Sequence, residues 1–109
     1  MNYVTLTGRI ATDLEIKEIG ENKILNFNIA VKRNFKNNND EYETDFIRCV
    51  VFNKTAERLN EYSKKGDLIG VNGRLQVSTY EKDEEKRTSY EVVVSDLYFL
   101  TSKGNSNEE

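Results

Sequence analysis

Residues 46–66, FIRCVVFNKTAERLNEYSKKG, contain the change of hydrophobic period that decides the fold. The alternation from Phe46 to Phe52 has a period of two and is typical of a strand. Asn53 then suits the N-cap of a helix over residues 54–65. One face of that helix carries Ala56, Leu59 and Tyr62. Lys64 and Lys65 suit the negative end of the helix dipole, and Gly66 suits a left-handed residue after it.

Three further segments alternate with the same period and predict strands over residues 3–10, 25–32 and 69–80. In residues 69–80 the predicted inward side chains are Ile69, Val71, Leu75 and Val77. Residues 90–100 are almost continuously apolar, which predicts a strand buried on both faces. Residues 36–41 are polar and predict a loop tip.

The predicted order is therefore three strands, one short helix and two strands. Five strands leave exposed edges unless the sheet closes, so a small barrel is favoured. We predict an all-β fold, a five-stranded Greek-key barrel of the OB-fold type with one short helix between strands 3 and 4. The 109 residues suffice for one domain, expected over residues 1–101, with a short disordered acidic tail at 102–109.

The composition excludes several kinds of catalytic and metal site. The chain has no histidine and one cysteine, which excludes a Ser-His-Asp triad, a Cys-His dyad, histidine-ligated zinc, a thiolate zinc cluster and an internal disulfide. No pair of acids suggests a carboxylate-based enzyme. We therefore expect a binding protein rather than an enzyme, without cofactor or metal.

The net charge of −3 is unevenly distributed. Residues 1–80 hold 12 basic and 11 acidic side chains, whereas residues 81–109 hold 4 and 8. A near-neutral body can carry a basic stripe on one face. There is no signal peptide pattern and no apolar run of about 20 residues, so we expect a cytoplasmic protein without a membrane partner.

Aromatic and basic side chains share the outward parity of two predicted strands. Phe46 and Phe52 flank Arg48 on one strand, and Tyr80 has the parity of Arg74 on another. Nucleic-acid bases stack on aromatic rings, and arginine neutralises the phosphates between them. Duplex offers no free base faces, so this pattern predicts single-strand binding. A subunit interface is the alternative interpretation of the exposed rings.

Strand parity alone predicts that two other residues are buried and have a structural role. Phe35 has the parity of the core residues 27–31, so it is predicted to be buried unless a bulge or bend reverses it. Cys49 has the inward parity of its strand and is predicted to be an inert core residue.

Several motifs resemble the bacterial single-stranded DNA-binding proteins over roughly residues 2–100, in order and with few length changes. They are Val4–Ile10 with Asp13–Glu15, Phe27–Val31, Thr44–Phe52, Ala56–Gly66 and Gly70–Leu75. The resemblance implies an OB-fold that coats and protects single-stranded DNA in replication, recombination and repair, with little sequence preference. It also implies a homotetramer, with a dimer as the alternative.

The resemblance assigns site residues as well. Base stacking is expected on Phe35, Phe46, Phe52 and Tyr80, which overrules the parity of Phe35. Phosphate contacts are expected at Arg9, Arg33, Lys54 and Arg74, and the strand pattern adds Arg48.

The sequence departs from the family in three ways, the first being Gln76, Ser78 and Thr79 on the fourth predicted strand, where many members have basic residues. It has no tryptophan, so its stacking rings are smaller. Cellular members carry a long tail with an acidic-hydrophobic tip that binds replication and repair proteins, whereas residues 102–109 have no hydrophobic anchor. The short form resembles a phage or mobile-element version acting in the bacterial cytoplasm, with replication or recombination proteins as further partners. A primosomal adaptor and a protein- or sugar-binding OB module are the alternatives.

Overall fold

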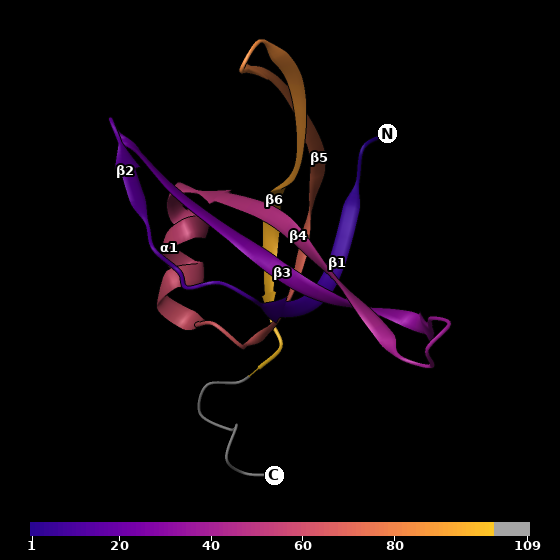
Figure 1. The fold of residues 1–109 in the computed structure, drawn as a ribbon. Helices are drawn as coiled ribbons and strands as arrows, with labels where there is room; N and C mark the ends of the chain where they lie inside the picture. Colours follow the sequence, from indigo (N-terminus) through magenta and orange to yellow (C-terminus); the bar gives the residue numbers. More distant parts are fainter. Residues whose placement is uncertain (102–109) are drawn as a thin grey trace.

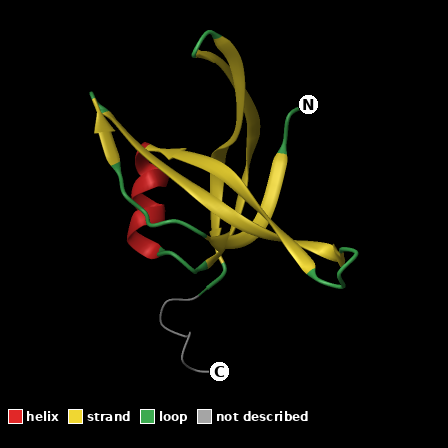
Figure 2. Cartoon of the chain, in the orientation of Figure 1, coloured by secondary structure: helices red, strands yellow, loops and turns green. Residues whose placement is uncertain are grey.

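The computed structural model describes residues 1–101, which form six strands and one helix (Figures 1 and 2). The elements are β1 (Val4–Ile10), β2 (Lys17–Ile19), β3 (Asn22–Lys36), β4 (Tyr42–Phe52), α1 (Asn53–Tyr62), β5 (Leu68–Lys82) and β6 (Glu85–Phe99). The predicted tail, residues 102–109, lies outside the described residues. No helix within residues 1–101 is long and apolar enough to cross a membrane.

Five strands close into a barrel in the order β1-β5-β6-β4-β3, because β1 also pairs with β3. The pairs are antiparallel except β4 with β6, where Cys49 pairs with Val92 and Val50 with Val93. The predicted OB-type barrel, with its helix between the third and fourth barrel strands, is confirmed. The sequence did not predict β2, a three-residue strand paired only with β3.

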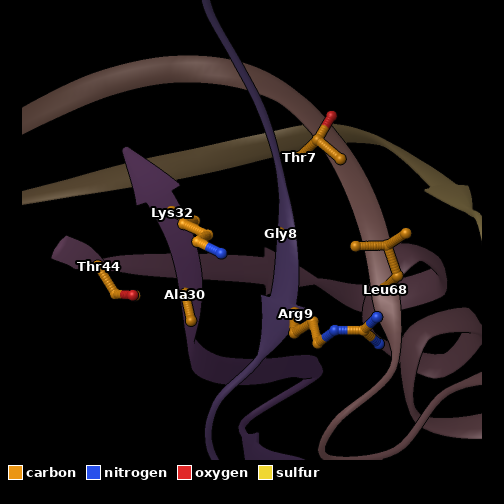
Figure 3. Close-up of a pocket in the computed structure, with 7 residues that line it drawn as sticks. All are labelled: Thr7, Gly8, Arg9, Ala30, Lys32, Thr44 and Leu68. Carbon is orange, nitrogen blue, oxygen red and sulfur yellow. The ribbon is translucent and has the colours of Figure 1, made fainter. Parts of the chain in front are cut away.

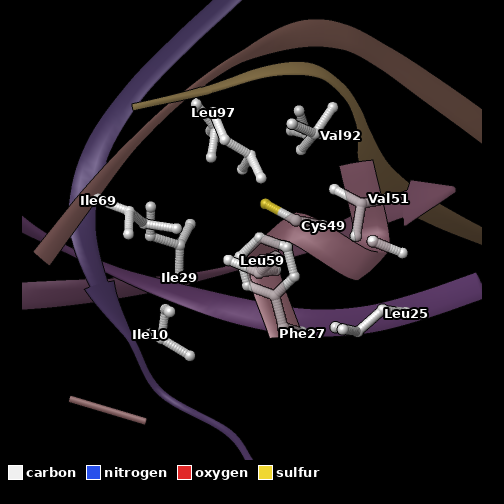
Figure 4. Close-up of a cluster of buried hydrophobic side chains, with 13 residues drawn as sticks. Ile10, Leu25, Phe27, Ile29, Cys49, Val51, Leu59, Ile69, Val92 and Leu97 are labelled. Atoms are coloured by element: carbon white, nitrogen blue, oxygen red, sulfur yellow. The ribbon is translucent and has the colours of Figure 1, made fainter. Parts of the chain in front are cut away.

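The core fills the barrel and is closed at one end by α1 (Figure 4). Ala56 and Leu59 of the helix are fully buried against the strands, as their spacing predicted. Tyr62, the third residue of that face, is half exposed and packs edge-on against Phe99. Cys49 is fully buried, so its predicted place in the core is confirmed.

The predicted start and end of the helix were wrong. Asn53 is the first helical residue, and Phe52 at the N-cap makes no side-chain capping bond. The Asn53 side-chain oxygen instead accepts the Lys23 backbone N–H, which ties the helix to β3. The helix ends at Tyr62, before the two lysines, and Gly66 has φ +99° but lies three residues beyond the C-cap Ser63.

Two hairpins extend beyond the barrel: the β3–β4 arm, residues 32–44, and the β5–β6 arm, residues 75–92 (Figure 1). The loop predicted over 36–41 lies at the tip of the first arm. Leu75 and Val77 were predicted to be inward but are exposed, at 41% and 51%. Their parity is that of the barrel interior, and Val92 opposite Leu75 is still buried, but the arm leaves the barrel here and core side chains no longer cover Leu75 and Val77.

The last strand is buried on one face only, contrary to the prediction. Its core residues are Val92, Val94 and Leu97, whereas Val93 on the outer face is only partly buried, and Tyr98 and Leu100 are exposed. The β5–β6 register shifts at Asn72/Gly73, which pair with Asp96 and Val94. Ser95 is therefore an extra residue, and this bulge reverses the parity of everything after it.

Candidate nucleic-acid interface

The outer surface of the barrel is built from residues that face each other across β3 and β4. In register, Ala30 pairs with Phe46, Asn28 with Arg48, and Ile24 with Phe52. Directly paired residues lie on the same face of a sheet. Both phenylalanines therefore lie on the barrel exterior with Arg48 between them, as the strand pattern predicted.

The same exterior continues over β6 onto β5. Val50 pairs with Val93, and Val93 pairs with Arg74, so the Arg74 side chain lies in the row between Arg48 and Phe52. Val50 has outward parity but is buried, so neighbouring side chains on this surface cover it. The Arg48 Nε atom lies 3.8 Å from Glu91 Oε1, and Arg74 has no ion pair among residues 1–101.

The four predicted stacking rings are all exposed, between 41% for Phe52 and 65% for Phe46. Tyr80 lies on the β5–β6 arm opposite Arg87, with the outward parity of Arg74. Phe35 is 61% exposed, so its parity-based burial was wrong. The reason is that Phe35 lies near the end of β3, on the arm that extends beyond the barrel, where no core side chains cover it.

The predicted cations have different surroundings. The Arg9 guanidinium donates to the Gly66 carbonyl at 3.0 Å. Arg33 makes two hydrogen bonds to Asp45, of 2.9 and 3.0 Å, and a 3.2 Å ion pair to Glu43. The Arg33 bonds hold the pKa of the Asp45 carboxyl below its usual range. Lys54 is exposed in the first turn of α1.

A cavity of about 350 Å³ opens on the exterior where β1 and β3 separate (Figure 3). Two cationic side chains, Arg9 and Lys32, line it together with Thr7, Gly8, Ala30, Thr44 and Leu68. None of these seven residues is acidic. Such a lining favours an anion.

Sequence patterns did not single out a cluster on the β3–β4 arm. The ammonium groups of Lys32 and Lys36 lie 4.8 and 5.7 Å from the centre of the Tyr42 ring. Tyr42 is 47% exposed. The signal was present, because Tyr42 has the outward parity of Phe46, but the predicted strand began at Phe46.

The chain matches the model of the single-strand binding protein family over residues 1–100. The chain belongs to this family. It is 34% identical over 108 residues to the single-stranded DNA-binding protein of Staphylococcus epidermidis, covering 99% of this chain and 82% of that protein. It is 46% identical to single-stranded DNA-binding protein 1 of Clostridium acetobutylicum, covering 94% of this chain and 96% of that one.

A solved structure supports the same assignment. The barrel is similar to that in the Plasmodium falciparum SSB complex with single-stranded DNA, with a TM-score of 0.82 and 25% identity. The likeness covers 93% of this chain and 96% of that chain. Family membership thus agrees with the fold predicted from the strand order and with the motifs that carried the resemblance.

The single cysteine of this chain, Cys49, is buried. Burial raises the pKa of Cys49 to about 12, with a smaller contribution from the Glu91 carboxylate. The thiol is therefore protonated at neutral pH and is not a nucleophile. Residues 1–101 hold no group of three or more acidic or cysteine side chains that could bind a metal ion.

Proposed function

We propose that this chain binds single-stranded DNA without sequence preference, coating and protecting the strand during replication, recombination and repair. The observation that carries the proposal is the row of exposed rings and cations that runs over β3, β4, β6 and β5 on one exterior surface. The names of the relatives support it. The site performs no chemistry on the strand, and the chain acts as a binding protein in the cytoplasm.

Each side chain has a role that follows from its surroundings. Phe35, Phe46, Phe52 and Tyr80 stack on bases, and Arg9, Arg33, Arg48, Lys54 and Arg74 contact phosphates. Stacking tolerates any base because every base has a flat face, so the interface has little sequence preference. A phosphate at Arg33 has to compete with Asp45 and Glu43, so this residue contributes less than Arg74.

Binding to oligo-dT is expected to weaken with salt, and duplex of equal length is expected to bind far more weakly. Each neutralised phosphate contributes about −0.7 to the slope of log K against log salt for a single strand. The measurement is a titration of both ligands across a salt series. Equal affinity for duplex, or an affinity that salt leaves unchanged, would contradict the proposed function.

We also propose that the chain assembles as a homotetramer, with a dimer as the alternative. β1 pairs with β5 over its length, but only Arg9 and Ile10 pair with β3. The outer edge of residues 4–7 therefore has no strand partner within residues 1–101. An open edge favours pairing with its own copy about a two-fold axis.

A second surface supports assembly. Leu75, Val77 and Tyr90 are exposed on one face of the β5–β6 arm, where Val77 pairs directly with Tyr90. A contiguous exposed apolar face is typical of an interaction surface. Replication or recombination proteins are further candidate partners.

Sedimentation equilibrium is expected to give about four times the 12.6 kDa chain mass without oligo-dT, and that mass plus the bound DNA with it. The reason is that pairing through β1 covers one surface and leaves the arm face for a second pairing. A species that stays at the chain mass at micromolar concentration would overturn both the tetramer and the edge pairing.

A further inference from the structure

The cluster on the β3–β4 arm lies on the same exterior surface as the proposed DNA path. Lys32 pairs with Thr44, and Lys36 pairs with Tyr42. Tyr42, Thr44 and Phe46 alternate along β4, and the contacts of both ammonium groups with the Tyr42 ring place them on its side of the arm. The two lysines therefore extend the surface beyond Phe46, toward the tip of the arm.

The two lysines differ from the neighbouring Arg33 in the acids around them. Arg33 is held by two carboxylates, whereas the Lys32 ammonium group has no ion pair or hydrogen bond among residues 1–101. Lys36 has one acidic partner, Asp40, at 3.4 Å, and that carboxylate is 83% exposed. An exposed pair of this kind is weak and is readily exchanged for a stronger anion.

Lys32 also connects the cluster to the cavity between β1 and β3. Its ammonium group lies at the Gly8 side of that cavity, and the Arg9 guanidinium lies further along it (Figure 3). Arg9 pairs with Ala30, which in turn pairs with Phe46. Arg9 and Lys32 thus line one cavity next to the strand pairs that carry Phe46, and Lys36 continues the positive charge toward the tip of the arm.

We propose that Lys32 and Lys36 bind two consecutive phosphates of single-stranded DNA as the strand passes Phe46, and that Tyr42 is the positioning residue that holds both ammonium groups toward the strand. This proposal rests on the proposed function and deepens it. The face of an aromatic ring attracts cations, so the ring orders two side chains that otherwise sample many rotamers. The neutral ring orders the two ammonium groups and leaves their positive charge available, whereas the carboxylates at Arg33 neutralise the charge of that residue.

The test compares two double variants of the full chain that change the net charge equally. Lys32→Gln with Lys36→Gln removes the proposed contacts. Lys23→Gln with Arg58→Gln is the control, because Lys23 pairs with Glu57 on α1 and Arg58 lies over Phe99. The slope of log K against log salt is measured for oligo-dT with each protein, after thermal unfolding confirms that both variants are folded.

The first double variant is expected to have a slope shallower by about 1.4, that is 0.7 for each lost contact, and the control to keep the wild-type slope. Equal slopes for both variants would overturn the inference, because net charge alone would then explain any change in affinity. The wild type keeps this result separate from the function itself. If the wild type binds oligo-dT with a salt-dependent affinity and the first double variant has the same slope as the wild type, only the inference about the two lysines fails. If the wild type does not bind oligo-dT, the proposed function fails as well.

The role of the ring is tested by Tyr42→Phe and Tyr42→Leu. Phenylalanine keeps the cation contact and is expected to retain wild-type affinity for oligo-dT. Leucine removes it and is expected to weaken binding about two- to fivefold, as for one exposed cation–ring contact. In the Lys32→Gln, Lys36→Gln background the leucine change is expected to have no further effect. Equal affinity of the leucine and phenylalanine variants would show that the ring does not position the lysines.

Discussion

Phe46→Ala and Phe52→Ala are each expected to weaken oligo-dT binding by about 1–3 kcal/mol, or about 5- to 150-fold. Both rings are exposed on the barrel exterior, at 65% and 41%, so truncating either leaves no internal cavity. The free energy of unfolding is therefore expected to change little. Titration with oligo-dT measures the first quantity, and denaturant unfolding measures the second.

Tyr62→Ala serves as the control for an exposed ring that lies away from this surface. It is half exposed on α1 and packs edge-on against Phe99. Its removal is expected to leave DNA affinity unchanged. If Phe46→Ala or Phe52→Ala lowers stability but not the affinity of the folded protein, the rings are structural and the proposed stacking is wrong.

Gly73→Ala and Gly8→Ala are expected to destabilise the barrel, each by about 1–3 kcal/mol. An added Cβ would lie 2.1 Å from the Val93 carbonyl oxygen at Gly73, and 2.2 Å from the Ala30 carbonyl oxygen at Gly8. Both obstacles are backbone atoms of a paired strand, which cannot turn aside as a side chain can. Each kcal/mol lowers Tm by about 4–8 °C for a domain of this size.

Gly70→Ala is the matched control on the same strand as Gly73. An added Cβ there meets the Tyr98 side chain at 3.6 Å, an ordinary contact. Its Tm is expected to stay within a few degrees of wild type. Comparable losses at positions 70 and 73 would show that the cost reflects glycine replacement in a strand and not the close approach of two backbones.

The sequence predicted the barrel because hydrophobic period is a local property. Strand order, the helix at Ala56 and Leu59, and the outward parity of Phe46 and Phe52 all follow from it. Phe35 and Leu75 could not be placed this way. The exposure of Phe35 depends on where the β3–β4 arm leaves the barrel, and that of Leu75 depends on where the β5–β6 arm leaves it. Both are properties of strand pairing, which no single segment encodes.

The partners of the charged and polar side chains could not be predicted from the sequence either. Arg33 and Lys32 are neighbours in the chain, yet one is paired with Asp45 and Glu43 and the other lies over Tyr42. Asn53 looked like a helix cap because its type favours that position, but its oxygen bonds the backbone of β3. Which partner each of these side chains binds depends on the groups that the fold brings near it, and the sequence alone does not show these.

Cys49 gives the barrel a built-in reporter of its own opening. The thiol is the only one in the chain, it is fully buried, and its pKa of about 12 keeps it protonated. A thiol-specific reagent can reach it only when the strands β3, β4 and β6 part, so the labelling rate measures how often the barrel opens. A ligand that binds across β4 and β6 on the exterior slows the labelling without contacting the sulfur. The labelling rate of this one thiol therefore reports both the opening of the barrel and the binding of the ligand.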